Sequence, residues 1–132
     1  MNKFGSGIHV LVKNDDGKYL VMRRKLNDDS DAGNWDFPGG GIHLGEQPFE
    51  TAIRETLEET GMNIKLIRPL TQYALQYGET WSTESIVLAE TNDKDVKLSE
   101  EHTEFKWVPW EELKDIEPKG THLKAIEGLS LS

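Results

Sequence analysis

The segment from Gly40 to Met62, GGIHLGEQPFETAIRETLEETGM, constrains the fold of this chain more than any other part. Pro48 suits the first turn of a helix, where its missing backbone N–H costs nothing, and Gly61 suits the position just past a helix end. The sequence therefore predicts one helix between these two residues, preceded by a glycine-rich loop. The segment also carries glycines, glutamates and one arginine at fixed intervals: Gly40, Glu46, Arg54, Glu55, Glu58, Glu59 and Gly61.

The predicted helix has two different faces. A helix advances about 100° per residue, so Glu55, Glu58 and Glu59 fall within roughly 100° of arc. Three apolar residues line the opposite side, with Thr56 and Thr60 at the edge of their stripe. We expect the helix to bury this apolar stripe against a core and to present its carboxylates on the other face. The stripe consists of Phe49, Ile53 and Leu57.

Carboxylates this close together repel one another, and like charges at i,i+4 weaken a helix. An acidic helix face that is simply solvated is the ordinary interpretation of such a pattern. A bound divalent cation is the alternative, because it would relieve the repulsion, and the adjoining glycine loop favours it. Oxygen ligands prefer hard ions, so Mg²⁺ is the first choice and Mn²⁺ the second.

Alternating apolar residues on both sides of this segment predict a mixed β-sheet flanked by helices, hence an α/β fold. Residues 26–34 are expected to form a polar loop and residues 38–41 a turn. Shorter helical patterns cover residues 110–115 and 121–128. The predicted strands are residues 7–13, 18–24, 35–37, 63–68, 71–77, 83–90 and 105–108.

Composition limits the function further. A chain of 132 residues is expected to form one domain spanning residues 1–132. Its lack of cysteine excludes disulfides and thiolate metal sites and favours the cytoplasm. The sequence contains neither a signal peptide pattern nor an apolar run long enough to span a membrane. The net charge of −9 argues against nucleic acid and acidic membranes as partners.

The spacing of the Gly40–Met62 segment resembles the Nudix hydrolase signature, G-x5-E-x7-R-E-U-x-E-E-x-G-U, in which U is a bulky apolar residue. Every fixed position matches; Thr56 stands at the first U and Met62 at the second. The resemblance implies an α/β/α sandwich with a mixed sheet. It also implies an enzyme that hydrolyses a nucleoside diphosphate linked to another group, by attack of water on a phosphorus with the help of Mg²⁺.

The resemblance also implies roles for individual residues. Glu58 and Glu59 would be the primary metal ligands, with Glu55 either a further ligand or the base that orients the water. The carbonyl of Gly39 would complete the coordination. Outside the signature, one of Glu100, Glu101 and Glu104 would add a carboxylate, and Glu101 is our choice; the alternative is that all three only solubilise a loop.

Arg54 is expected to pair with Glu46 and to clamp the glycine loop against the helix, which would hold Glu55 in position. The alternative is an ordinary exposed ion pair, which contributes little. By the same resemblance, we count Glu46, Arg54, Glu55 and Glu58 as the catalytic set.

Three residues are predicted to contact the substrate: Arg23, Gly40 and Trp81. Arg23 and Arg24 alternate along a strand, so only one can point toward a phosphate. Trp81 lies in a polar stretch and could stack on a base. The other tryptophans within strand patterns, Trp35 and Trp107, are expected in the core. The four histidines show no zinc-binding spacing.

The compact length and the residues before the helix look most like the MutT-related group of this family. The predicted substrate is a nucleoside triphosphate, including triphosphates with an oxidised base, cleaved to a nucleoside monophosphate and pyrophosphate. The alternatives are ADP-ribose, a dinucleoside polyphosphate, or a domain that senses nucleotides without turnover. Relatives in this family often form homodimers, so a homodimer is a possible state.

Overall fold

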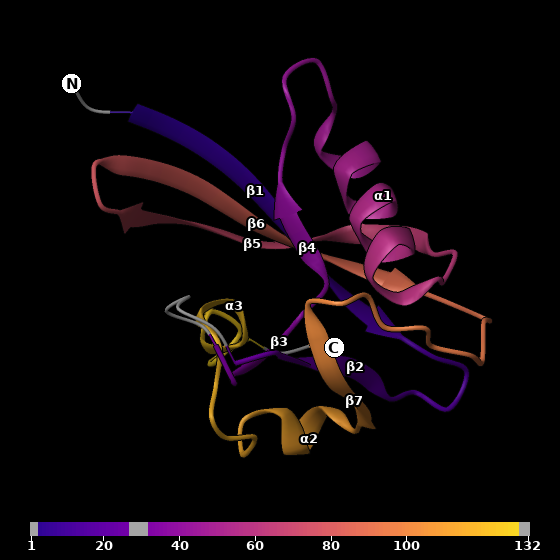
Figure 1. The fold of residues 1–132 in the computed structure, drawn as a ribbon. Coiled ribbons are helices and arrows are strands. Elements are labelled where there is room, and N and C mark those ends of the chain that lie inside the picture. Colours follow the sequence, from indigo (N-terminus) through magenta and orange to yellow (C-terminus); the bar gives the residue numbers. More distant parts are fainter. Residues whose placement is uncertain (1–2, 27–31, 130–132) are drawn as a thin grey trace.

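The computed structural model describes residues 3–26 and 32–129. One mixed sheet forms its centre, with strands in the order β3-β2-β1-β6-β5; β4 pairs with β1 and β7 pairs with β2 (Figure 1). The long central strands β1 and β6 run parallel, and the remaining pairs are antiparallel. The strands are β1 (Lys3–Lys13), β2 (Tyr19–Arg24), β3 (Trp35–Asp36), β4 (Gly39–Gly41), β5 (Lys65–Tyr77), β6 (Thr80–Glu90) and β7 (His102–Val108).

Helices cover the two faces of this sheet. Figure 1 shows α1 (Pro48–Thr60) on one side and the short helices α2 (Trp110–Leu113) and α3 (Thr121–Lys124) on the other. The chain therefore has the predicted α/β/α arrangement with a mixed sheet. Within the described ranges, no helix has the length and apolar character needed to cross a bilayer.

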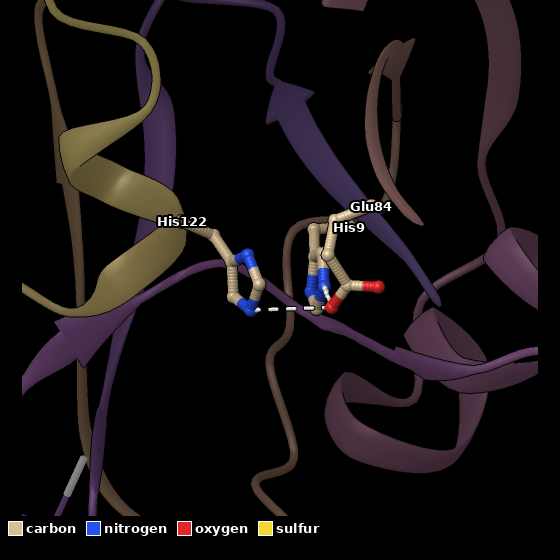
Figure 2. Close-up of side chains that lie close together, drawn as sticks. All are labelled: His9, Glu84 and His122. Carbon is tan, nitrogen blue, oxygen red and sulfur yellow. Dashed lines mark hydrogen bonds and ion pairs between the residues drawn. The ribbon is translucent and has the colours of Figure 1, made fainter. Parts of the chain in front are cut away.

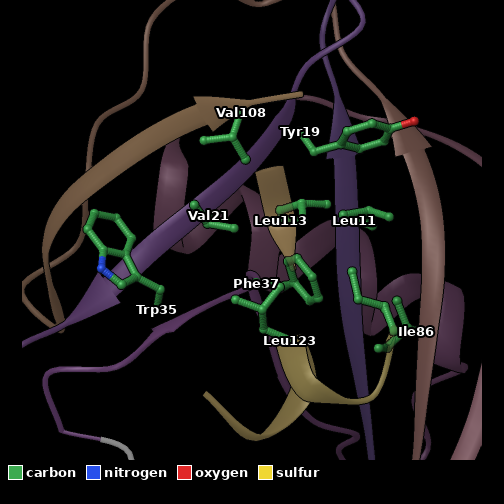
Figure 3. Packing of buried hydrophobic residues seen from close by; sticks show 10 residues of the cluster. Leu11, Tyr19, Val21, Trp35, Phe37, Ile86, Val108, Leu113 and Leu123 are labelled. Carbon is green, nitrogen blue, oxygen red and sulfur yellow. The ribbon is translucent and has the colours of Figure 1, made fainter. Parts of the chain in front are cut away.

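Two clusters of buried apolar residues lie between the sheet and the helices on its two faces. Side chains of α2 and α3 pack with one face of the sheet, where Leu113, Leu123, Phe37 and Ile86 meet (Figure 3). The second cluster lies under α1 and includes Ala52, Met62 and Val10. Residues alternate along each strand, so one strand supplies both clusters: Leu11 faces the first, and Val10 and Val12 face the second.

Helix α1 agrees with its predicted limits but not with its predicted buried face. The expected apolar stripe is substantially exposed, at 54% for Phe49, 42% for Ile53 and 46% for Leu57. The prediction was wrong because small residues allow a closer approach of the helix to the sheet than large apolar ones. Their hydroxyls are satisfied within the helix, since Thr56 donates to the Ala52 carbonyl at 2.8 Å and Thr60 to that of Thr56 at 2.6 Å. The buried residues of the helix are Thr51, Ala52, Thr56 and Thr60.

Several strand boundaries also differ from the predicted ones. The two strands expected at residues 63–68 and 71–77 form one strand, β5, in which register shifts on either side of Pro69 accommodate the missing N–H. The expected turn at residues 38–41 contains the short strand β4, and the helix expected at residues 121–128 is limited to α3. Trp35 is buried, as expected. The expected polar loop at 26–34 falls mostly on residues 27–31, outside the described residues.

Candidate functional site

Helix α1 is fixed at its end by Gly61, which adopts the left-handed conformation with φ 72° and donates its N–H to the Leu57 carbonyl at 2.8 Å. Glycine adopts this conformation without strain. The candidate site therefore lies on a helix with defined limits, and the signature glutamates and arginine on this helix have the helical spacing that the sequence predicts.

The glycine strand β4 lies close to the acidic face of α1. The Gly39 N–H donates to Glu59 Oε2 at 3.1 Å. A Cβ added at Gly40 would lie only 2.8 Å from the carboxyl carbon of Glu55, and one at Gly39 would meet the Nδ1 of His9 at 2.5 Å. Both positions need glycine, because any side chain there would displace a neighbouring polar group.

Arg54 lies at the centre of the acidic cluster and contacts three of its glutamates. Its Nε and Nη2 donate to the two oxygens of Glu46 at 2.7 and 3.0 Å, a bidentate pair. Its Nη1 donates to Glu55 Oε1 at 2.9 Å and to Glu58 Oε2 at 3.3 Å. Arg54 thus joins the loop before the helix to two carboxylates on the helix.

Glu46 is held more firmly than a residue of an ordinary surface ion pair. Its side chain is 14% exposed, and it also accepts hydrogen bonds from the Thr51 hydroxyl at 2.6 Å and from the His43 N–H at 3.2 Å. The hydrogen bonds from Arg54 and Thr51 lower the pKa of Glu46 to about 2. Glu46 is therefore ionised throughout the neutral range.

Glu59 has the opposite electrostatic environment. Burial raises the pKa of Glu59 to about 8, and the negative charges of Glu55 and Glu101 act in the same direction. The hydrogen bond from Gly39 and the charge of Arg24 lower the pKa, but they do not outweigh burial. Among the signature residues, Glu59 is thus a partly buried carboxyl group that a cation would stabilise in its ionised form.

The carboxylates of α1 do not all converge on one point. Glu58 is 58% exposed and contacts Arg54, whereas Glu59 is directed to the glycine strand. Over residues 3–26 and 32–129, one group of three or more potential ligands has all its ligand atoms within 4.8 Å of one another. It consists of His9, Glu84 and His122 and includes no residue of α1. The structure brings Glu46, Glu55 and Glu58 together through Arg54 and places Glu59 beside them.

Residues outside the helix occupy different positions around this cluster. Glu101 is near enough for its charge to act on Glu59, whereas Glu104 pairs with Arg23 at 3.2 Å. Arg23 also donates to the Gly33 carbonyl at 2.9 Å. Of the two neighbouring arginines, it is Arg24 whose charge acts on Glu59. The predicted role of Arg23 in phosphate binding stays a prediction, and Arg24 is the better placed of the two.

Trp81 is 46% exposed and lies beside the turn between β5 and β6, where it pairs with Gln76. Figure 1 shows this hairpin extending away from α1. Its exposure matches the sequence-based prediction, but its place in the fold is distant from the acidic helix face. Base stacking on Trp81 remains a prediction.

A second polar cluster, which the sequence analysis missed, lies on the opposite side of β4. His9 Nε2 is 3.3 Å from Glu84 Oε1, and His122 Nε2 is 4.0 Å from the same oxygen (Figure 2). The two imidazole rings stack with centroids 3.3 Å apart. Burial and the neighbouring His9 lower the pKa of His122 to about 3. The available signal was Glu84, an acidic residue inside the strand pattern of β6.

Comparison with known proteins adds the following findings. A family model described as NUDIX domain matches residues 3–127. A putative 8-oxo-dGTP diphosphatase of Bacillus subtilis is 41% identical over 63 residues, which cover 48% of this chain and 39% of that protein. A CMP-5'-(N-acetyl-N-hydroxy-3-aminopropyl)phosphonate hydrolase of Streptomyces rubellomurinus is 31% identical over 112 residues, which cover 83% of this chain and 54% of that protein. The match thus spans less than two thirds of either curated relative.

Among solved structures, the crystal structure of a MutT protein from Methanosarcina mazei Go1 has a similar fold, with a TM-score of 0.84 and 29% sequence identity. The match covers 94% of this chain and 90% of that chain. The likeness therefore extends over most of this chain.

Proposed function

The chain belongs to the Nudix family, and from this premise we propose that it is a Mg²⁺-dependent phosphoanhydride hydrolase. The proposed substrate is a nucleoside triphosphate, including triphosphates with an oxidised base. Water adds across one phosphoanhydride bond, so that the products are a nucleoside monophosphate and pyrophosphate. The similarity to a putative 8-oxo-dGTP diphosphatase supports the choice of a triphosphate.

One observation carries the proposal: Arg54 joins Glu46, Glu55 and Glu58 into a single hydrogen-bonded group beside a glycine strand. An ordinary solvated helix face would not need a bidentate ion pair between its loop and its centre, nor glycines at the two positions where Glu55 and Glu59 approach β4. The geometry supports a pre-organised set of carboxylates, which hydrolysis of a phosphoanhydride requires.

The residues present fit a hard divalent cation. The candidate ligands are all oxygen atoms: Glu55, Glu58, Glu59, Glu101 and the carbonyl of Gly39. Burial keeps the pKa of Glu59 high, so a cation there would replace a proton that the carboxyl group otherwise holds. When bound, Mg²⁺ supplies charge neutralisation for the phosphates and makes a water molecule more acidic.

The protein side chains have separate tasks in this proposal. Arg54 and Glu46 position the loop and Glu55, while Glu55 accepts the proton of the attacking water. With a net charge of −9, the protein repels a polyphosphate at long range, so local cations must bind it. Arg24, whose positive charge acts on Glu59, is the arginine that we propose assists in this binding.

The test is release of pyrophosphate and phosphate from a panel of nucleotides, with Mg²⁺ and with a chelator. The panel contains canonical and oxidised nucleoside triphosphates, ADP-ribose, dinucleoside polyphosphates and a CMP-phosphonate. We expect turnover of a triphosphate that the chelator abolishes. Turnover of another member alone would replace the substrate while keeping the reaction class.

A matched pair of variants tests the site itself. Glu58→Gln should lower the rate by several orders of magnitude and retain the fold, because the side chain is 58% exposed. Glu50→Gln makes the same chemical change in the first turn of α1, outside the acidic cluster, and should leave the rate unchanged. Nucleotide binding without turnover across the panel would refute the enzyme and support a nucleotide-sensing domain.

A further inference from the structure

The cluster of His9, Glu84 and His122 unites three elements that are distant in the sequence. His9 lies on β1, Glu84 on the neighbouring β6, and His122 on α3, which covers this face of the sheet (Figure 2). All three side chains are buried, with relative exposures of 7%, 5% and 8%. A buried carboxylate is costly unless it is paired, and Glu84 has its partners within this cluster, His9 and Ser82.

The atoms that face one another are metal-ligating atoms. Tetrahedral Zn²⁺ with bonds of about 2.0–2.2 Å places its ligand atoms about 3.3–3.6 Å apart. His9 Nε2 and Glu84 Oε1 already have this separation, at 3.3 Å, and His122 Nε2 is 4.0 Å from the same oxygen. The two rings are stacked with an interplanar angle of 18°, so coordination requires the His122 ring to rotate out of the stack until both ring planes contain the ion.

Neighbouring side chains orient the potential ligands. The Ser82 hydroxyl donates to Glu84 Oε2 at 3.0 Å, which leaves Oε1 directed toward the two imidazoles. The Tyr73 hydroxyl is 2.6 Å from His122 Nδ1, on the other side of the ring from the Nε2 that faces Glu84. When His122 Nδ1–H donates to the Tyr73 hydroxyl oxygen, the lone pair of Nε2 is free to bind an ion, which is the usual arrangement of a metal-bound histidine.

The backbone around the cluster also holds it in place. The N–H of His122 donates to Asp36 Oδ2 at 3.0 Å, and the N–H of Gly120 donates to the Trp35 carbonyl at 2.7 Å. Gly7 leaves the space in which the Glu84 carboxylate lies, since a Cβ there would approach that group to less than 3 Å. These hydrogen bonds to β3 thus hold α3 in place beside the cluster, so coordination depends on reorientation of the imidazole rings.

We propose that His9, Glu84 and His122 form a transition-metal site that prefers Zn²⁺ and is separate from the glutamates of α1. Two imidazoles and one carboxylate match Zn²⁺, whereas Mg²⁺ prefers oxygen ligands alone. Three protein ligands leave a fourth position for water. The ion would join α3 to the two central strands and would balance the buried charge of Glu84. The proposal does not depend on the proposed hydrolase activity, and its tests measure no turnover.

The first experiment uses the unaltered chain, freed of metal with a chelator and then saturated with Mg²⁺ so that hard-ion sites are filled. Zn²⁺ is added while the imidazole nitrogens are followed by NMR; the chain has four histidines, so each can be assigned. We expect one equivalent to bind and the ring nitrogens of His9 and His122 to shift, with those of His43 and His102 unchanged. Failure to bind one equivalent, or binding that leaves His9 and His122 unshifted, overturns the proposal.

Variants then assign the ligands by Zn²⁺ titration, with circular dichroism confirming the fold. His122→Gln and His9→Gln should each weaken Zn²⁺ binding by more than about 100-fold. His43→Gln, which removes an exposed histidine of the glycine loop, should bind Zn²⁺ like the unaltered chain. Glu58→Gln should also bind normally. Loss of binding in Glu58→Gln but not in the His9 and His122 variants would assign the ion to α1 and refute the site.

Discussion

The buried face of α1 can be tested with two opposite substitutions, Ala52→Leu and Leu57→Ala. Ala52 is completely buried and belongs to the cluster that contains Met62 and Val10, whereas Leu57 is 46% exposed. The apolar pattern of the sequence alone predicts the reverse, because it assigns Leu57 to the core. The two variants therefore distinguish the helix orientation in the structure from the orientation that the sequence favours.

The expected magnitudes follow from burial. Enlarging a side chain in a packed core costs about 1–3 kcal/mol, so Ala52→Leu should lower the free energy of unfolding by that amount. Removing a fully buried leucine costs about 2–5 kcal/mol. With nearly half of its surface already in water, Leu57→Ala should cost only about 1 kcal/mol, and the better helix propensity of alanine offsets a small part of it.

The assay is equilibrium unfolding in urea, with the slope compared between variants to confirm that the transition remains two-state. A large loss of stability in Leu57→Ala, with Ala52→Leu close to the unaltered chain, would refute the orientation of α1 described above. It would also place the acidic face of the helix elsewhere, because both faces rotate together.

Two further predictions concern the glycine strand and the histidine cluster. Gly40→Ala places a methyl group 2.8 Å from the Glu55 carboxyl carbon, so the rate of nucleotide hydrolysis should fall by about 100-fold. The control is Gly41→Ala, whose added methyl group would have its nearest contact at 3.9 Å and which should retain the rate of the unaltered chain. Equal rates in the two variants would contradict the close approach of Gly40 to Glu55. In metal-free protein, burial lowers the pKa of His122 from 6.5 to about 3. The unfolded chain therefore binds more protons than the folded chain between these two pH values. The free energy of unfolding should accordingly fall as the pH drops from about 6.5 to 5. His122→Gln should show a shallower fall over this interval in urea titrations, and identical slopes would exclude His122 as the cause.

The sequence by itself determined the local features of this protein. Pro48 and Gly61 set the limits of α1, because their backbone preferences act within one turn of a helix. The resemblance to the Nudix signature also implied a contact between Glu46 and Arg54, which the structure contains at 2.7 Å. The roles of these residues in catalysis stay predictions, but the arrangement that brings them together was readable from the signature.

The tertiary structure alone decided which face of α1 is buried. Apolar periodicity favoured Phe49, Ile53 and Leu57, yet the sheet packs against small residues because these allow a close approach. Thr56 and Thr60 can be buried without the cost of an unpaired hydroxyl, because each hydroxyl donates to a backbone carbonyl of the helix. A pattern of hydrophobic residues does not contain this information.

The tertiary structure also decided which distant residues meet. His9, Glu84 and His122 are far apart in sequence, and their proximity depends on the parallel pairing of β1 with β6 and on the docking of α3 to Asp36. Sequence spacing reports contacts within a helix or a turn, because those repeat at fixed intervals. Contacts between elements depend on how the sheet is ordered, and only the folded chain contains that information.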